Sequence, residues 1–166
     1  MNPEAFAQLI TRFSAAATAG DGKALAACFT PDGTYFDYIY GTHQGRDAIA
    51  DMLENLFHRD ATDYDWAFYD PVVNGDTGYA HSLSTFVSTV PAFKGREVVI
   101  DGISRFVLQG GLIAEYHESV NGGVAHAQLG LAPEHMAKVM ARWAKRFRDR
   151  ADVETYRRAV RARYAK

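Results

Sequence analysis

The sequence lacks most of what marks a secreted, zinc-bound or membrane-spanning protein. It contains one cysteine, Cys28, so no disulfide can form within the chain, and no Cys/His cluster has the spacing of a zinc site. No apolar run approaches the roughly 18 residues that cross a bilayer. The N-terminus has no basic stretch that leads into an apolar one. We therefore expect a cytoplasmic protein with no membrane partner and no metal.

Internal repeats and low-complexity segments are also absent. The 166 residues are 48% hydrophobic, 23% charged and 13% aromatic, a composition typical of one globular domain with an ample core. We expect a folded domain over residues 1–132 and a helical extension over residues 133–166, packed on the same domain or on a partner subunit.

Charge is distributed unevenly along the chain. Residues 1–136 contain 7 Lys and Arg against 17 Asp and Glu, whereas residues 137–166 contain 11 against 3. The apolar residues of the basic segment keep helical spacing, and no base-stacking or groove-reading motif accompanies them, so we do not expect a nucleic-acid partner. The basic helix face is expected to be solvated and to dock on an acidic surface.

Hydrophobic periodicity predicts helices first and a meander of strands afterwards. Turn residues at 74–76, 91–95 and 109–111 separate the last four strands, as in antiparallel sheets. This order predicts an α+β fold, in which a curled, mixed but mainly antiparallel sheet wraps around the N-terminal helices. A further helix follows Pro133, and its apolar stripe includes Trp143. The spacing predicts helices over 3–19, 22–29 and 46–58, and strands over 34–40, 62–70, 77–90, 95–108 and 112–120.

Four short segments resemble the nuclear transport factor 2-like superfamily: Ala19-Gly20-Asp21, Phe29-Thr30-Pro31-Asp32-Gly33, Gly45-Arg46-Asp47-Ala48-Ile49, and Gly111-Leu112-Ile113 before Glu115-Tyr116-His117-Glu118. The resemblance spans roughly residues 5–121 and implies a cone-shaped α+β fold. It is less specific for function, because the superfamily contains ketosteroid isomerases, limonene-epoxide hydrolases, scytalone dehydratases, SnoaL-like polyketide cyclases and non-catalytic binding modules.

The resemblance to ketosteroid isomerase places Asp37 at the position of that enzyme's general base. The two oxyanion-hole positions carry Phe13 and Ser104 instead of tyrosine and aspartic acid. A serine hydroxyl is a weaker donor to a developing oxyanion than a carboxylic acid. The resemblance therefore implies proton abstraction and not steroid isomerisation.

The resemblance to limonene-epoxide hydrolase concerns the same strands. Tyr35 and Asp37 match that enzyme's pocket tyrosine and asparagine, and Tyr116 and Glu118 match its last-strand tryptophan and aspartate. The hydrolase's central arginine and aspartate fall near His81 and Leu83. Its charged triad is therefore incomplete here, and epoxide opening by its mechanism is not expected.

Two carboxylates are the candidate acid and base. Asp37 lies between Phe36 and Tyr38 in an aromatic run, where a charge is costly unless it is paired. The alternative is a structural role as the cap of the loop at Gly41. Glu118 shares a strand face with Tyr116, and the resemblance favours that face as the inner one; the alternative is a solvent-facing Glu118 with His117 inside.

Histidine is the third candidate group, because it titrates near neutrality. His81 shares with Leu83 the more apolar face of its strand, so we expect it to face inward, either as a catalyst or as a satisfied core residue. His43, Tyr38 and Tyr40 are expected at a rim or lid beside the first strand; the alternative is that the aromatic residues only pack there.

These residues, together with the resemblance, predict a cofactor-independent lyase or isomerase of the SnoaL-like type. Its reaction is expected to be a dehydration, isomerisation, cyclisation or carbon–carbon lyase step. Asp37 is the expected base, His81 with Glu118 the acid/base partner, and Tyr35 and Tyr116 the donors to a substrate oxygen. The substrate is expected to be small, hydrophobic, and aromatic or carbonyl-bearing. The alternative is a ligand-binding or dimerisation module without chemistry. A homodimer or higher homo-oligomer is expected, with association through the outer sheet face. The residues expected to contact substrate are Phe13, Tyr38, Trp66, Leu83, Ser104 and Phe106.

Overall fold

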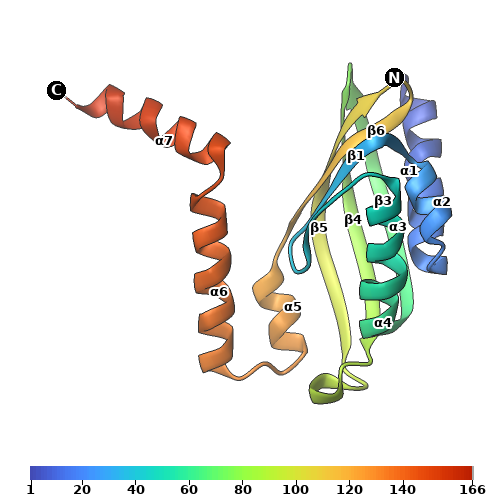
Figure 1. The fold of residues 1–166 in the computed structure, drawn as a ribbon, viewed down its shortest axis with the longest axis vertical. Helices are drawn as coiled ribbons and strands as arrows, with labels where there is room; N and C mark the ends of the chain where they lie inside the picture. Colours follow the sequence, from blue (N-terminus) through green and yellow to red (C-terminus); the bar gives the residue numbers. More distant parts are fainter. Residues whose placement is uncertain (166) are drawn as a thin grey trace. The chain divides into compact units, whose positions relative to one another are not determined.

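The computed structural model describes residues 1–165, which form two compact units, one spanning Met1–Leu129 and the other beginning at Gly130 (Figure 1). The first unit contains the sheet and the helices that cover one of its faces. The second contains two helices and is described separately below.

The N-terminal helices are set by their caps and by one apolar stripe. Helix α1 (Pro3–Ala19) begins where the Asn2 side chain accepts a hydrogen bond from the Ala5 N–H at 2.8 Å, and ends at Gly20 with a φ of 69°. Helix α2 (Gly22–Ala27) begins where Asp21 caps the Ala24 N–H at 2.9 Å. The α1 stripe is fully buried and consists of Phe6, Leu9, Ile10, Phe13, Ala16 and Ala17.

The helix expected over residues 46–58 is confirmed in position but is not uniform. It comprises α3 (Arg46–Met52), a π-helical turn η1 (Leu53–Phe57) and the single turn α4 (His58–Asp60). The apolar residues Ile49, Met52, Leu53 and Phe57 point into the core throughout. The π-turn changes the helical phase, as single π-turns within α-helices do.

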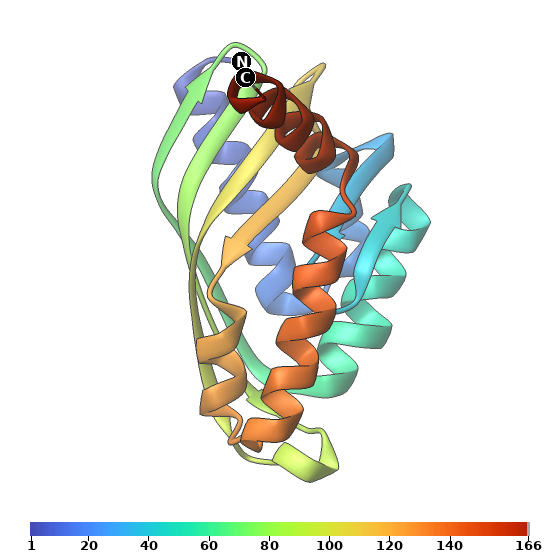
Figure 2. The same cartoon turned by 90° about the vertical axis from the view of Figure 1, so that its left-hand side faces the viewer.

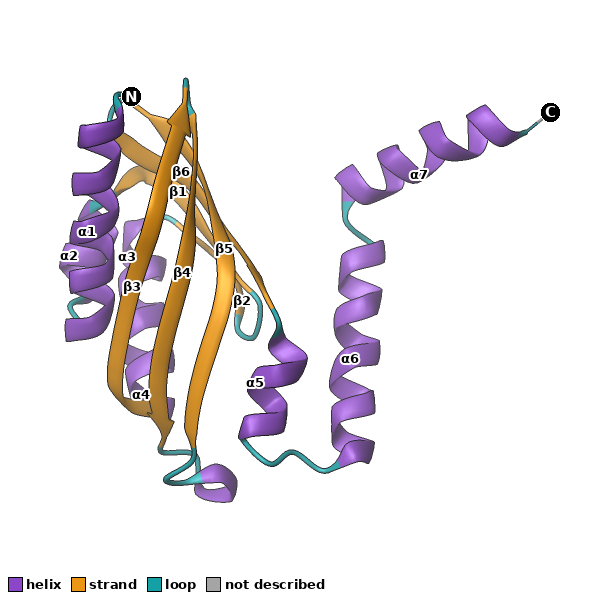
Figure 3. Cartoon of the chain, turned by 180° about the vertical axis from the view of Figure 1, so that it is seen from behind, coloured by secondary structure: helices purple, strands orange, loops and turns teal. Residues whose placement is uncertain are grey.

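Six strands form one mixed sheet in the order β2-β1-β6-β5-β4-β3. Strands β1 and β6 pair in parallel, and every other neighbouring pair is antiparallel. Helices α1 to α4 cover one face, which we call the inner face (Figure 3). The strands are β1 (Phe29–Asp37), β2 (Gly41–Gln44), β3 (Ala61–Asn74), β4 (Thr77–Ser88), β5 (Glu97–Gln109) and β6 (Leu112–Val120).

Irregularities in the strands explain two errors in the predicted boundaries. Strand β3 continues past residue 70 because a bulge near Asp70, with a φ of 49°, precedes Pro71. Since β3 is an edge strand, it tolerates a proline that has no N–H to donate. Strand β1 begins at Phe29 and not at 34, because the expected turn at 30–33 is a register shift within the strand. Figure 2 shows the curl of the long strands past α1.

Phe13 is the centre of the aromatic core. Its ring lies 4.8 Å from that of Tyr116, 5.6 Å from that of Trp66 and 6.2 Å from that of Tyr35, measured between centroids. These contacts join α1 to strands β1, β3 and β6. Phe106 and Phe29 complete the same group.

Helix α5 (Gly122–Gln128) follows β6 and was not predicted from the sequence. β6 ends opposite Gly102, so the beginning of β5 has a free edge beyond that point. The Gln128 amide fills part of that edge: its oxygen accepts from the Val99 N–H and its nitrogen donates to the Val99 carbonyl, each at 2.9 Å. A side-chain amide thus replaces a missing strand partner.

The second unit contains two helices where the sequence indicated one continued stripe. Helix α6 (Pro133–Arg148) and helix α7 (Ala151–Tyr164) are interrupted at Arg150, which has an extended backbone with a ψ of 136°. Trp143 is the buried side chain of α6, whereas Phe147 and Tyr156 are exposed. No helix within residues 1–165 combines the length and apolarity that a membrane span needs.

Substitution Phe13→Ala should destabilise the protein by about 3 to 5 kcal/mol, because it removes a fully buried ring that many aromatic neighbours contact. Urea denaturation followed by circular dichroism measures the change. The control is Tyr156→Ala in α7, an exposed tyrosine whose loss should cost less than about 1 kcal/mol. Equal losses for the two variants would contradict this account of the core.

Candidate functional site

Four polar residues form a hydrogen-bonded group on the inner face of the sheet, which we call the Glu118 cluster: Tyr35, Ser104, Tyr116 and Glu118. The parallel register of β1 and β6 sets Tyr35 beside Tyr116, and the antiparallel register of β5 and β6 sets Ser104 beside Glu118. The cluster therefore draws residues from three adjacent strands, of which β1 is distant in the sequence from β5 and β6.

The hydrogen bonds of the cluster have a defined direction. Tyr116 donates its hydroxyl to Glu118 Oε1 at 2.8 Å, and Tyr35 donates to the same oxygen at 3.2 Å. The Ser104 hydroxyl lies 2.8 Å from the Tyr116 hydroxyl. Since the proton of Tyr116 is engaged with Glu118, Ser104 is the donor in that pair. Both phenols and the serine thus stabilise one carboxylate oxygen.

The second carboxylate oxygen of Glu118 is arranged differently. Among residues 1–165, Oε2 has no hydrogen-bond partner, and it is not one of the enclosed polar atoms. Glu118 is only half-buried as a residue, although its Oε1 is held between the phenols. One oxygen is therefore fixed by the protein while the other is accessible.

Burial raises the pKa of Glu118 to about 7, and the nearby negative charge of Asp37 acts in the same direction. The hydrogen bonds from Tyr116 and Tyr35 lower the pKa but do not offset burial. A carboxyl group with this pKa exchanges its proton near neutrality.

The two tyrosines remain proton donors at any pH at which the protein works. Both rings are fully buried, and burial raises each phenol pKa well above its ordinary value, with the charge of Glu118 as the next cause. Their hydroxyl protons are therefore available to Glu118 whenever it ionises.

Asp37 lies at the end of β1, on the same strand face as Tyr35. Its Oδ1 accepts hydrogen bonds from the backbone N–H groups of Ile39 and Tyr40. Burial raises the pKa of Asp37, while the Tyr40 and Ile39 N–H groups and the charge of His43 lower it. The hydrogen bonds of Asp37 are therefore those of a residue that caps the loop. The charge of Asp37 also raises the pKa of Glu118.

Sequence reasoning missed Tyr64 and did not place His43 on a strand. His43 was expected at a rim, but it pairs with Tyr35 in the β1–β2 register, and its Nε2 is enclosed without a hydrogen-bond partner among residues 1–165. The hydroxyl of Tyr64 on β3 also has no partner there, and the charges of Asp37 and Glu118 contribute to raising its pKa after burial. The position of His43 was not predicted because β2, the strand of four residues that carries it, was not predicted.

The expectation that His81 faces inward is wrong. His81 is half-exposed on the outer face, between Tyr79 and Leu83, and its Nε2 lies 2.7 Å from Asp101 Oδ1. Leu83 shares that face, so its expected contact with substrate is wrong as well. Ala80 and Ser82 point inward in their place.

Close packing of α1 explains this reversal. A Cβ atom added to Gly78 would lie 2.4 Å from the Phe6 ring, so the inner face of β4 admits only small residues near the helix. The bulkier face of β4 is therefore turned outward, and the rule that the more apolar face is buried fails here. His117 is likewise not inside: it stacks on Phe36 at 4.1 Å and bonds to Glu115.

The remaining candidates differ in accessibility. Phe13, Ser104 and Phe106 are completely buried around the cluster. Trp66 is half-buried, and its Nε1–H is enclosed without a hydrogen-bond partner among residues 1–165. Tyr38 is exposed at the tip of the β1–β2 turn.

Neither carboxylate of the site is paired with a cation. In the described chain, Asp37 and Glu118 form no ion pair with Lys or Arg. Arg46 is committed to the Phe29 carbonyl at 2.7 and 3.0 Å, and Arg59 to Asp60. No three His, Cys, Asp or Glu residues within 1–165 are grouped as metal ligands.

A curled mixed sheet, helices on one face, and polar groups on that same face define a cone-shaped α+β domain of the nuclear transport factor 2-like class. Within that class, residues 10–116 match the model of the SnoaL-like domain, and the chain belongs to this family. No curated protein matches the chain in sequence.

Solved structures share the fold at low sequence identity. TsrD from Streptomyces laurentii is 23% identical, with a TM-score of 0.70, and the match covers 80% of this chain and 99% of that one. A protein of ketosteroid isomerase-like fold from Catenulispora acidiphila, in complex with trimethylamine, is 20% identical, with a TM-score of 0.68 and coverage of 75% and 94%. An LEH-like epoxide hydrolase of M. tuberculosis is 13% identical, with a TM-score of 0.62 and coverage of 76% and 89%.

Substitution Glu118→Gln should make the stability of the protein less dependent on pH. Since the folded pKa is raised from 4.5 to about 7, native Glu118 holds its proton more tightly than the unfolded chain does, and stability is lost as pH rises between these values. The variant should match the wild type near pH 5 and be roughly 1 to 3 kcal/mol more stable at pH 8. Urea denaturation at the two pH values measures this, and an unchanged pH dependence would contradict the assigned burial of Glu118.

Proposed function

We propose that this chain is a cofactor-independent lyase or isomerase that transfers protons on a small, neutral, carbonyl-bearing substrate. The observation that carries the proposal is the Glu118 carboxyl, which has a pKa of about 7, one oxygen held by two phenols and the other accessible. An acid for catalysis at neutral pH needs this pKa and an accessible oxygen.

The proposed reaction divides the work between the two carboxyl groups. Asp37 removes a proton from the carbon next to the substrate carbonyl. Glu118, protonated at Oε2, donates its proton to the carbonyl oxygen or to a leaving hydroxyl, so that no charged enolate accumulates. The raised pKa of Asp37 makes it a stronger base than an ordinary aspartate.

The phenols act on Glu118 in this proposal. Tyr35 and Tyr116 were expected to hold a substrate oxygen, and both instead donate to Glu118 Oε1. When Glu118 gives up its proton, these two donors stabilise the carboxylate that forms. Tyr64, whose hydroxyl has no partner within residues 1–165, is the phenol that remains for a substrate oxygen.

The charge of the site favours a neutral substrate. Two carboxyl groups without a Lys or Arg partner repel an anionic ligand, because a buried negative charge is costly unless it is compensated. Aromatic rings pack on the phenols of the Glu118 cluster, Phe57 on Tyr35 and Phe13 on Tyr116. Apolar surroundings of this kind suit an apolar substrate with one polar oxygen.

A second candidate function is the binding of a small amine without chemistry. The uncompensated carboxylates and aromatic rings that disfavour an anion also suit a cation. The structurally similar protein from Catenulispora acidiphila holds trimethylamine. A cation bound beside Glu118 would lower its pKa and displace its proton.

Exchange of carbon-bound hydrogen for deuterium tests the first candidate without knowledge of the product. Wild-type protein in deuterated water should speed the exchange of protons next to the carbonyl in at least one of a panel of small aryl and alkyl ketones, followed by proton NMR. Asp37→Asn and Glu118→Gln should each slow this exchange by about 10²-fold. The matched control is Asp101→Asn on the outer face, which should leave the rate unchanged.

The outcomes separate the two candidates. Loss of exchange in both site variants, with Asp101→Asn unaffected, supports proton transfer. Wild-type rates in Asp37→Asn would eliminate Asp37 as the base. Saturable binding of trimethylamine that Glu118→Gln abolishes, with no exchange of any ketone, would favour the binding function.

We also propose that two copies of the chain associate through the outer face of β3, β4 and β5. This face exposes large apolar side chains that alternate with charges, and exposed patches of this kind mark protein interfaces. Light scattering at micromolar concentration should give twice the chain mass of 18.4 kDa, and Ile103→Glu should return the single mass. A wild-type mass of one chain would contradict the proposal. The exposed residues are Tyr69, Val72, Tyr79, Val99 and Ile103.

A further inference from the structure

Tyr40, in the turn between β1 and β2, contacts Asp60 and Phe57, which precede β3 in the first unit. The turn follows Asp37 directly, and its tip exposes Tyr38 and Ile39, which are 39% and 48% accessible. The Ile39 and Tyr40 N–H groups both donate to Asp37 Oδ1. The conformation of the turn therefore decides whether these two donors reach the carboxylate.

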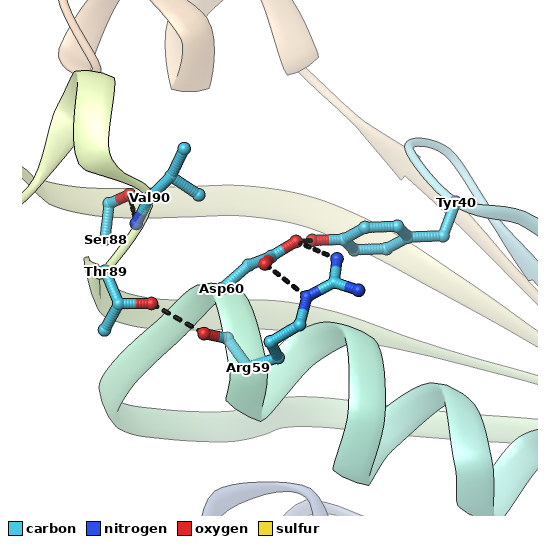
Figure 4. Close-up of polar contacts among 6 residues, drawn as sticks. All are labelled: Tyr40, Arg59, Asp60, Ser88, Thr89 and Val90. Carbon is cyan, nitrogen blue, oxygen red and sulfur yellow. Dashed lines mark hydrogen bonds and ion pairs between the residues drawn. The ribbon is translucent and has the colours of Figure 1, made fainter.

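Tyr40 is fixed at the far end of its ring. Its hydroxyl donates to Asp60 Oδ2 at 2.7 Å, and its ring packs on Phe57 with centroids 5.5 Å apart (Figure 4). Asp60 is the last residue of α4. A contact of this length across 20 residues holds the turn against a helix terminus.

Asp60 is itself held from several directions. Arg59 donates two hydrogen bonds to its carboxylate, each of 2.7 Å, and the Asp60 carbonyl accepts from the Thr89 N–H at 2.9 Å. The Thr89 hydroxyl donates to the Arg59 carbonyl at 2.7 Å (Figure 4). The corner that receives Tyr40 is thus tied to the loop after β4.

The electrostatics keep this contact intact near neutrality. The hydrogen bond from Arg59 lowers the pKa of Asp60, so its carboxylate stays ionised as an acceptor. Burial, followed by the hydrogen bond to Asp60, raises the pKa of Tyr40, so its hydroxyl stays a donor. Neither partner titrates in the range where Glu118 does.

We propose that Tyr40, held by Asp60, is a positioning residue for Asp37. Tyr40 makes both contacts. Its hydroxyl donates a hydrogen bond to Asp60, and its backbone N–H donates one to Asp37 Oδ1. The β1–β2 pairing alone provides little restraint, because β2 has only four residues. The proposal rests on the role of Asp37 as the base in the proposed function.

Variant Tyr40→Phe removes the hydroxyl and leaves the ring. Hydrogen exchange of the Ile39 and Tyr40 amides should become about threefold to tenfold faster, the equivalent of one lost hydrogen bond. The pKa of Asp37 should rise, because the N–H donors that lower it are engaged for less of the time. Both are measured by NMR of the full chain without substrate. The other titratable groups that act on Asp37, which are Glu118, His43, Tyr35, Tyr64 and Tyr116, are unchanged in the variant.

A second variant approaches the same contact from the other side. Asp60→Ala removes a negative charge, which by electrostatics alone would lower the pKa of Asp37. If the contact positions Asp37, the pKa should rise instead. The double variant Tyr40→Phe/Asp60→Ala should exceed neither single variant by a measurable amount, because both break one contact. The control is Tyr156→Phe in α7, an exposed tyrosine, which should change neither quantity.

These measurements distinguish the proposal from a purely structural role. A lower melting temperature, with unchanged amide exchange at Ile39 and Tyr40 and an unchanged pKa of Asp37, would overturn it. A fall in the pKa of Asp37 in Asp60→Ala would do the same. Failure of the proposed function is detected separately, by wild-type proton exchange on ketones in Asp37→Asn.

Discussion

A carboxyl group buried against two tyrosine phenols is the constraint on which the site depends. Transfer of an ionised carboxylate out of water is costly, and the protein reduces that cost with donors on Oε1 alone. The donors are insufficient to keep Glu118 ionised at its ordinary pKa, and the charge of Asp37 raises the pKa further. Glu118 therefore changes its protonation state where proton transfer requires it.

This arrangement requires the sheet topology. The parallel pairing of β1 with β6 sets Tyr35 directly opposite Tyr116, and β5 supplies Ser104 from the other side of β6. Helix α1 closes the inner face with Phe13, whose ring contacts both tyrosines. Aromatic packing thus fixes the two phenols, and the phenols hold the Glu118 carboxyl by hydrogen bonds. Asp37 is the second carboxyl group of the site.

Much of the fold was predictable because local signals agreed with the tertiary structure. Caps at Asn2 and Asp21 and one apolar stripe define α1 and α2, and turn residues separate the long strands. The short strand β2 and helix α5 were not predictable, since β2 is specified by pairing with β1 and α5 by the free edge of β5.

The site was predictable in part for the same reason. Alternation along β1 and β6 grouped Tyr35 with Asp37 and Tyr116 with Glu118, and the resemblance to limonene-epoxide hydrolase selected the face of Tyr116 and Glu118 as the inner one. The rule that the more apolar face of a strand points inward failed for His81 and Leu83. The closeness of α1 to β4 decides which face of β4 is the inner one. The position of His43 was not predicted because it depends on the register of β2 with β1.

The most direct test of the central claim is the titration of the Glu118 side-chain carboxyl, followed by carbon NMR in the wild type and in Asp37→Asn. The account predicts a midpoint near the pKa of about 7 in the wild type and a lower midpoint in the variant, because the repelling charge is removed. A wild-type midpoint near the ordinary value of 4.5, unchanged in Asp37→Asn, would contradict it.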